Sequence, residues 1–307
     1  MVERHDPAQA AGDGVLSSPA AVRQALAAQG YLAEPDLSAA CFLASRLTRP
    51  LLCEGPPGVG KTSLAAALAA LTGGPLIRLQ CYDGLDSTHA LYDWDFAAQI
   101  LHIRTIEAQA KALGRPIGAR ELADELHDRR FLLARPVLQA LESSTERGRA
   151  VLLIDEIDRA DDEFDALLLE VLSEWSVTVP EFGTITAAIP PLVILTSNRT
   201  RELHDALRRR CLYHWFAQPD ADQEERILAQ HVPESAARLR AAVVAEAGRL
   251  RAAGPAKPPG TAETIDWLRA LSALGVEELH QPAARAALSA VLKDADDVAR
   301  FGGDDRA

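Results

Sequence analysis

The chain has 307 residues, and 32 lysines and arginines against 44 aspartates and glutamates give it a formal net charge of −12. This acidic balance argues against a general nucleic-acid binder, because contacts to a phosphate backbone need a basic face. The longest apolar runs are too short to cross a membrane, and the amino-terminal segment lacks the apolar stretch of a signal peptide. Four cysteines in so long a chain fit the reducing cytoplasm, where we expect the protein to act.

The first half of the chain alternates helices and strands, as an α/β domain does. Residues 1–18 have little periodicity and are expected to form a flexible tail. Apolar residues at helical spacing predict helices, and short apolar runs predict strands. The helices are expected over 19–29, 36–47 and 61–71, and the strands over 50–54 and 75–80. Residues from about 83 to 135 are mixed, with aromatic residues early and a charged helix at 119–130.

The second half adds two further apolar strands and then becomes entirely helical. The strands are expected over 150–155 and 192–197, with a helix over 164–175 and a hairpin over 176–189 between them. From about residue 220 onward only helices are predicted, with a break at 254–260. The expected organisation is an α/β fold with a parallel sheet over 19–218, a small all-helical domain over 219–300 and a short tail over 301–307.

A phosphate-binding loop is the strongest signal in the sequence. The segment Gly55-Pro-Pro-Gly-Val-Gly-Lys-Thr62 matches the motif G-x-x-x-x-G-K-[ST] and stands between an apolar strand and a helix, as that motif requires. Glycines let backbone N–H groups turn toward a phosphate, the helix N-terminus adds partial positive charge, and Lys61 can reach the β- and γ-phosphates of ATP. The predicted nucleotide contacts are Gly55, Pro56, Pro57, Gly58, Val59, Gly60, Lys61, Thr62 and Ser63.

Two acidic residues, Asp155 and Glu156, stand at the carboxyl end of the apolar strand expected over 150–155. Ligands of open α/β sheets bind at the carboxyl ends of the strands, so Asp155 and Glu156 are expected beside the phosphates. The Thr62 hydroxyl and Asp155 would hold Mg²⁺, and Glu156 would orient and polarise the attacking water. A water-activating glutamate beside the metal aspartate separates ATP hydrolases from small-molecule kinases, which need an acceptor instead.

Together these motifs resemble those of the AAA+ ATPases. The strand that ends in Thr196-Ser-Asn198 is similar to the sensor-1 strand of that family, and by this resemblance Asn198 would help to place the attacking water. Tyr31 and Leu32 stand where relatives wrap the adenine. The resemblance implies ATP and Mg²⁺ as cofactors and self-association into a ring, with a hexamer expected.

Two further segments narrow the resemblance to the MoxR branch of AAA+. The long segment at about 83–135 fits an insert in helix 2, and the hairpin at 176–189 fits the pre-sensor-1 hairpin. The pattern from Leu79-Gln-Cys-Tyr82 to His102-Ile-Arg104 is similar to the ATPases encoded with carbon-monoxide-dehydrogenase maturation genes, the CoxD-like group. That resemblance implies a chaperone that remodels a client metalloenzyme, such as a molybdenum–copper hydroxylase, together with a partner that carries a von Willebrand A domain.

A cluster of five arginines follows the sensor-1 strand: Arg199, Arg201, Arg208, Arg209 and Arg210. AAA+ rings supply an arginine from one subunit to the phosphates bound by the next. Arg210 stands where relatives carry the arginine of an Asp-Arg-Phe sequence, and Arg209 replaces the aspartate, so the choice between them is open, and Arg208 is a further, less favoured candidate. No arginine stands where a sensor-2 residue is expected, in the stretch 257–267, and Lys257 is either a substitute or part of a solvated loop.

Other residues point to less specific structure. Cys211 and His214 have the spacing of half a zinc site, but such a site needs a second pair, and none is near in the sequence. Trp94 and Phe96 are either exposed aromatic residues that contact a client or part of the insert's own core, and the core is favoured because large apolar side chains are mostly buried. Two alternative functions stay open. One is a DNA-associated motor or clamp loader, which the acidic insert disfavours, and the other is a scaffold that binds ATP with little turnover.

Overall fold

The computed structural model describes residues 16–113, 125–180 and 182–301. The tails expected over 1–18 and 301–307 lie mostly outside these residues, as does the first half of the helix expected over 119–130. No helix of the described residues is both long and apolar enough to cross a membrane.

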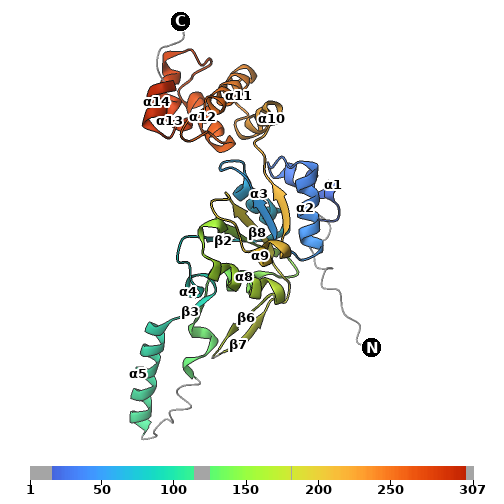
Figure 1. Ribbon diagram of the computed structural model, residues 1–307. Helices are drawn as coiled ribbons and strands as arrows, with labels where there is room; N and C mark the ends of the chain where they lie inside the picture. The colour runs from blue at the N-terminus through green and yellow to red at the C-terminus, as the bar shows by residue number, and fades with distance from the viewer. Residues whose placement is uncertain (1–15, 114–124, 181, 302–307) are drawn as a thin grey trace.

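A five-stranded parallel sheet with the order β2-β5-β8-β1-β9 forms the centre of the molecule (Figure 1). Its strands are β1 (Leu51–Glu54), β2 (Gly73–Gln80), β5 (Arg149–Asp155), β8 (Leu192–Ser197) and β9 (Leu212–Trp215). The register aligns Gln80 with Asp155 and Glu54 with both Ser197 and Trp215, so the carboxyl ends of the strands lie along one edge. The expected α/β fold with a parallel sheet is confirmed.

Strand β9 is absent from the sequence-based prediction. It is one of the two edge strands of the sheet, and Tyr213 and Trp215 on one of its faces are exposed. Such a short, half-exposed run lacks the continuous apolar signal by which buried strands are recognised.

Helices cover both faces of the sheet. Leu51 and Cys53 of β1 pack against the helices of one face, and Leu52 between them packs against those of the other. The helices are α1 (Pro19–Ala28), α2 (Pro35–Arg46) and α3 (Lys61–Thr72) on the first face, and α7 (Pro136–Ser143) and α8 (Asp162–Glu174) on the second. The Ser18 hydroxyl and the Asp161 carboxylate cap α1 and α8 by accepting a backbone N–H of the first turn.

Between β2 and β5 the chain leaves the body of the molecule. It forms α4 (Ser87–Ala90), β3 (Tyr92–Trp94), α5 (Phe96–Leu113), a 3-10 turn (Arg129–Phe131) and β4 (Leu132–Ala134), which pairs antiparallel with β3. Helix α5 projects at one end of the molecule (Figure 1). The hairpin of β6 (Ser176–Val179) and β7 (Gly183–Thr186) lies at the same end, in the stretch where the sequence predicts a hairpin.

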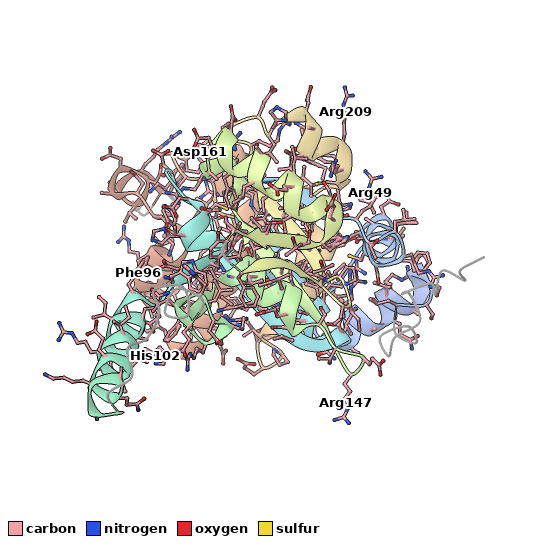
Figure 2. All side chains as sticks on the ribbon, turned by 90° about the horizontal axis from the view of Figure 1, so that it is seen from below. Arg49, Phe96, His102, Arg147, Asp161 and Arg209 are labelled. Carbon is pink, nitrogen blue, oxygen red and sulfur yellow. The ribbon has the colours of Figure 1, made fainter. Side chains whose placement is uncertain are left out.

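The two aromatic residues of this segment have different environments. Trp94 is half-buried and packs against the core of the sheet, as expected. Phe96 is 64 % exposed, and Leu101 further along α5 is 68 % exposed. The expectation of a buried Phe96 is therefore wrong, because Phe96 begins α5 where that helix leaves the body (Figure 2).

After β9 the described residues form only helices, at the end of the molecule opposite α5 (Figure 1). They are α10 (Ala221–His231), α11 (Ala237–Ala252), α12 (Thr261–Ala273), a 3-10 helix (Pro282–Ala287), α13 (Leu288–Val291) and α14 (Ala295–Phe301). We call this set the C-terminal helices. They share an apolar core of their own, in which Leu250, Trp267 and Leu271 are buried. The short helix α9 (Asp205–Arg210) precedes β9 and packs on α8.

Candidate functional site

The loop between β1 and α3 surrounds the ammonium group of Lys61. Its Nζ donates to the backbone oxygens of Gly55 (2.6 Å) and Pro56 (2.7 Å) and to Oδ1 of Asn198 (2.8 Å). Burial lowers the pKa of Lys61, while nearby carboxylates, with Asp158 foremost, act in the opposite direction. The three acceptors fix the ammonium group inside the turn.

Two glycines let this loop turn. Gly58 and Gly60 have φ angles of 75° and 95°, in the left-handed region that residues with a side chain rarely adopt. Gly60 is also the N-cap of α3, which begins at Lys61. The unpaired N–H groups of the first helical turn therefore adjoin the loop, where a phosphate can accept hydrogen bonds from them.

The carboxylate of Asp155 lies at the carboxyl end of β5 and is buried. Its Oδ1 accepts from the Thr196 hydroxyl (2.5 Å), and its Oδ2 accepts from Nη2 of Arg78 (2.5 Å). The Thr62 hydroxyl lies 3.1 Å from Oδ1 and 3.3 Å from Oδ2. Hydroxyl and carboxylate oxygens are ligands that Mg²⁺ takes alongside water and substrate phosphates. Thr62 and Asp155 therefore fit a magnesium site.

Glu156 follows with a φ of 55°, which is unusual for a residue with a side chain. Its backbone N–H donates to the Thr196 hydroxyl (2.9 Å). Its Oε2 accepts from Nε2 of Gln80 (3.0 Å) and from Nη1 of Arg159 (3.1 Å). Backbone strain of this kind persists only where the surroundings enforce it, and it is concentrated at functional sites. These contacts set the direction of the Glu156 carboxylate.

Asn198 follows β8 directly, and Asp158 anchors its backbone. The Asn198 N–H donates to both carboxylate oxygens of Asp158 at 3.2 Å, and Thr200 donates to the same carboxylate from its N–H (2.8 Å) and its hydroxyl (2.7 Å). Burial alone would raise the pKa of Asp158, but these hydrogen bonds outweigh it and lower that pKa. The ionised carboxylate thus holds the turn that presents the Asn198 side chain to Lys61.

One cavity of about 610 Å³ joins these groups, because Lys61, Thr62, Asp155, Glu156 and Asn198 all line it. The other predicted nucleotide contacts in its lining are Pro57, Gly58, Val59, Gly60 and Ser63 of the loop and Tyr31 and Leu32 before α2. Gly55 and Pro56 do not line the cavity, and their carbonyl groups hold Lys61 instead.

Tyr31 connects the segment after α1 to the loop. Its hydroxyl donates to the backbone oxygen of Gly60 at 3.3 Å. Burial, followed by the nearby Cys53, raises the pKa of Tyr31 well above its usual value. The hydroxyl therefore stays protonated at neutral pH and remains a hydrogen-bond donor to the loop.

Helices α10 and α12 form the opposite wall of the cavity. Their lining residues are Gln223, Ile227, Gln230, His231, Thr261, Ala262 and Ile265. Within the described part of the C-terminal helices, neither a lysine nor an arginine lines the cavity. Lys257, the candidate substitute for a sensor-2 arginine, is exposed and stands outside the lining.

Two arginines after β8 are bound by a buried carboxylate of their own chain. Glu54, the last residue of β1, is 2 % exposed, and its Oε2 lies 3.7 Å from Nε of Arg199 and 3.8 Å from Nη2 of Arg208. The Arg199 guanidinium also lies over the Trp215 ring, 5.8 Å from its centroid. Both side chains are therefore engaged within the subunit.

The remaining three arginines of the cluster differ in their partners. Arg201 pairs with Asp165 (3.2 Å), and Nη1 of Arg210 donates to the backbone oxygen of Leu169 (3.2 Å). The Arg209 side chain is exposed and makes no hydrogen bond or ion pair with any residue that the structure describes. It extends outward from α9 (Figure 2). Neither Arg209 nor Arg210 lines the cavity of its own subunit.

All four cysteines are free and buried. Burial raises the pKa of Cys41, Cys81 and Cys211 to about 12, so these thiols remain protonated at neutral pH. Across residues 16–113, 125–180 and 182–301, no group of three or more His, Cys, Asp or Glu side chains is arranged to hold a metal ion.

Sequence reasoning missed four residues that contact the two carboxylates: Arg78, Gln80, Arg159 and Thr196. Arg78 and Gln80 alternate on β2, and Gln80 is the register partner of Asp155. A polar pair at the end of β2 predicts a contact with these carboxylates only when β2 is known to lie beside β5. The sequence alone does not give this neighbour relation.

Comparison with known proteins gives one family match and several distant similarities. A family model described as AAA domain (dynein-related subfamily) matches residues 50–211, just over half of the chain. A Lon protease from Rhizobium meliloti (strain 1021) is 26 % identical over 204 residues, which are 63 % of this chain and 21 % of that protein. The chain thus spans about a fifth of the length of this relative.

Among solved structures, the chain is similar to the Thermotoga maritima RuvB Holliday junction branch migration motor. The TM-score is 0.43 at 15 % identity, over 88 % of this chain and 70 % of that one. A mutant of the same RuvB gives a TM-score of 0.46 at 16 % identity, over the same shares of the two chains.

Proposed function

Because the chain belongs to the AAA domain family (dynein-related subfamily), we propose that it binds ATP with Mg²⁺ and hydrolyses it to ADP and phosphate. The observation that carries this proposal is the meeting of Lys61, Thr62, Asp155, Glu156 and Asn198 around one cavity. These residues come from three segments that are far apart in the sequence. They converge at the carboxyl ends of the strands, where ligands of α/β sheets bind.

Each group has a separate task in this proposal. Lys61 and the N–H groups of the loop bind the phosphates. Thr62 and Asp155 hold Mg²⁺, which when bound neutralises charge on the phosphates. Glu156 orients the attacking water and accepts its proton, and the Asn198 amide keeps that water in line. The C-terminal helices, over residues 219–300, form the lid of the site.

Nucleotide binding tests the first part of the proposal. Lys61→Ala should weaken Mg·ATP binding by at least about a hundredfold, because it removes the buried cation that would donate charge-assisted hydrogen bonds to the phosphates. Lys111→Ala is a matched control, since Lys111 is an exposed residue on the projecting helix α5. Titration calorimetry with a non-hydrolysable ATP analogue measures both. Equal affinities of the two variants would contradict the proposal.

For the assembly we propose a ring of six subunits in which Arg209 reaches the phosphates bound by the next subunit. Arg209 supports this assignment because its guanidinium has no partner among the described residues and extends outward from α9 (Figure 2). The Arg209 side chain can therefore contact a neighbouring subunit without first breaking a contact within its own subunit. Arg210, which the resemblance favours, would have to release the Leu169 carbonyl.

Turnover by arginine variants tests this assignment. Arg209→Ala should lower ATP hydrolysis by about a thousandfold, in the range found for arginines supplied from a neighbour, while Arg210→Ala costs less than about tenfold. Mixing Arg209→Ala subunits with Glu156→Gln subunits should restore part of the activity. Such mixtures contain interfaces where an intact Arg209 faces an intact Glu156. The reverse ranking of the two arginines, or no recovery on mixing, would contradict the assignment.

We further propose that the protein is a MoxR-type chaperone of the cytoplasm, a compartment that suits its four free cysteines. Its client is a metalloenzyme such as a molybdenum–copper hydroxylase, and its partner carries a von Willebrand A domain. The residue pattern of the insert and the projection of α5 from the body (Figure 1) support this role. Helix α5 exposes Phe96, Ile100 and Leu101. Grouped exposed apolar side chains are typical of protein-contact surfaces.

Stimulated hydrolysis tests the partner. The purified von Willebrand A partner should raise the ATPase rate of the wild type. Leu101→Ser should lose this stimulation and keep its basal rate, because Leu101 lies outside the cavity lining. Absence of any stimulation of the wild type would contradict this part of the proposal.

A DNA-associated motor is the main alternative, and the charge near the insert disfavours it. Residues 82–99 contain Asp83, Asp86, Asp93 and Asp95 and neither lysine nor arginine. Duplex DNA should therefore leave ATP hydrolysis unchanged even at low salt, where phosphate contacts are strongest. Hydrolysis that stays undetectable with and without the partner would instead favour a nucleotide-dependent scaffold.

A further inference from the structure

The C-terminal helices touch the phosphate loop through backbone atoms. The N–H of Ala262, in the first turn of α12, donates to the backbone oxygen of Gly58 at 3.0 Å. Next to it, Nε2 of Gln218 donates to the Thr261 hydroxyl at 3.2 Å, which ties the same turn to the segment after β9. The start of α12 thus rests on the loop itself.

Two glycines allow this close approach. A Cβ atom on Gly260 would lie 2.7 Å from the backbone oxygen of Pro57 and 2.9 Å from Cα of Gly58. A Cβ atom on Gly58 would lie 2.7 Å from Oε2 of Glu263 and 3.1 Å from Cα of Gly260. Backbone atoms cannot swing aside as the end of a side chain can, so a Cβ atom does not fit at Gly260, and the φ of 75° favours glycine at position 58.

Hydrogen bonds from Gly260 and Arg251 hold the start of α12 in position. Oε2 of Glu263 accepts from the N–H of Gly260 at 3.0 Å and closes the first turn. Behind it, the Arg251 guanidinium of α11 donates to the backbone oxygen of Pro259 (2.7 Å) and to the buried Glu224 of α10 (2.6 Å). One side chain therefore joins α10, α11 and the segment before α12.

We propose that the close contact between Gly58 and Gly260, with the hydrogen bond from Ala262, couples the phosphate loop to the C-terminal helices. We call this the glycine contact. Among the described residues of the C-terminal helices no lysine or arginine lines the cavity, so these helices bring no side-chain cation to a phosphate. Instead, the C-terminal helices contact the backbone of the phosphate loop. This inference rests on the proposed nucleotide function, since phosphate binding is what would order the loop.

The geometry of one peptide group explains the coupling. In a trans peptide, the C=O of Gly58 and the N–H of Val59 point in opposite directions. When Ala262 holds the Gly58 oxygen, the Val59 N–H is turned away from α12. In this proposal the Val59 N–H is one of the inward-directed groups from which a phosphate in the loop accepts, so phosphate binding favours this same orientation. Because coupling between two binding events is reciprocal, breaking the glycine contact weakens phosphate binding, and nucleotide tightens the contact.

Hydrogen exchange at Ala262 tests the contact without nucleotide. Gly260→Ala places a methyl group against the Pro57 oxygen, while the φ of −83° at this position suits any residue. The Ala262 amide should exchange at least about tenfold faster, equivalent to ~1.4 kcal/mol, and Leu268 deeper in α12 should keep its protection. Gly248→Ala is the matched control, because a Cβ atom there meets open space. Unchanged exchange at Ala262 in Gly260→Ala would overturn the proposal.

Affinity for Mg·ADP tests the coupling itself. Gly260→Ala should weaken binding by about tenfold, and Gly248→Ala should bind as wild type. Ala262→Pro is a second variant that removes the N–H donor at a position in the first helical turn where proline is tolerated, so it should give the same loss. Wild-type affinity in both Gly260→Ala and Ala262→Pro would overturn the coupling. If the wild type binds no nucleotide, the proposed function fails, and exchange at Ala262 alone decides the glycine contact.

Discussion

The two walls of the cavity are built from different chemistry. On the sheet side, Lys61, Asp155 and Glu156 present charges, and each is held by at least two hydrogen bonds. On the other side, α10 and α12 present apolar and neutral groups such as Ile227 and Ile265. That wall meets the phosphate loop through backbone atoms. The side formed by the strands and the phosphate loop, which we call the sheet wall, holds charged groups in fixed positions. The side formed by α10 and α12, which we call the helical wall, supplies a largely apolar surface.

This difference predicts different effects of substitution. Charges that are oriented before the substrate arrives need no rearrangement during the reaction, so the sheet wall suits the chemical step. An apolar wall adds affinity in proportion to the surface that it buries, and it binds ground state and transition state alike. Changes on the sheet wall should alter catalysis or metal dependence, whereas changes on the helical wall should alter affinity.

Arg78→Ala should show the largest effect among the residues that no motif marks. The Arg78 guanidinium lies 2.5 Å from Oδ2 of Asp155, so it would compete with a metal-bound water for that oxygen. Without it, the Mg²⁺ concentration for half-maximal hydrolysis should fall by about fivefold, as removal of a partly exposed ion pair worth ~1 kcal/mol implies. Arg159→Ala is the control, because Arg159 contacts Glu156 instead. Identical Mg²⁺ dependence in both variants would remove Arg78 from the metal site.

Ile265→Ala tests the helical wall and should have a smaller effect. The loss of buried methylene groups should raise the Kd of ATP by about threefold and leave kcat unchanged. Leu274→Ala, at the exposed end of α12, should change neither quantity. Steady-state kinetics together with equilibrium binding separate the two effects. A lower kcat with an unchanged Kd in Ile265→Ala would contradict the division between the walls.

The smallest effect concerns pH and His214, which lines the cavity at β9. Burial lowers the pKa of His214 below its usual value of 6.5, and the nearby Asp36 acts in the opposite direction. The unfolded chain therefore takes up this proton first, so stability is retained above pH 6.5 and falls as the pH drops below it. Urea unfolding at pH 7.5 and 5.5 should show a smaller loss in His214→Gln than in the wild type or in His280→Gln. The same pH dependence in all three proteins would exclude His214 as its source.

The sheet wall could be predicted from the sequence because its residues carry recognisable chemistry at fixed spacing. The loop Gly55–Thr62 is a contiguous motif, and Asp155, Glu156 and Asn198 each follow an apolar strand. Parallel strands bring their carboxyl ends to one edge, so the order along the chain suffices to bring these groups together. The α/β fold follows from the same alternation of strands and helices.

The helical wall could not be predicted in this way. Gly260 and Ala262 carry no functional group, and their contact with Gly58 joins segments that meet only in the folded chain. The arginine cluster shows the same limit, since the sequence gives its members but not their partners. Glu54, which pairs with Arg199 and Arg208, is the last residue of β1, whereas both arginines follow β8. The apolar character of Phe96 predicted a buried side chain, but it does not indicate where a helix leaves the body, and Phe96 is exposed.

The most direct test of the proposed site is ATP turnover by Glu156→Gln, measured on the same preparation as its Mg·ATP affinity. Glutamine keeps the shape and the contact with Gln80 or Arg159 but cannot accept the proton of the attacking water. Affinity should stay within about twofold of the wild type, and turnover should fall by at least about a hundredfold, as expected for loss of a general base. Wild-type turnover in Glu156→Gln would contradict the assignment of the chemical step to the sheet wall.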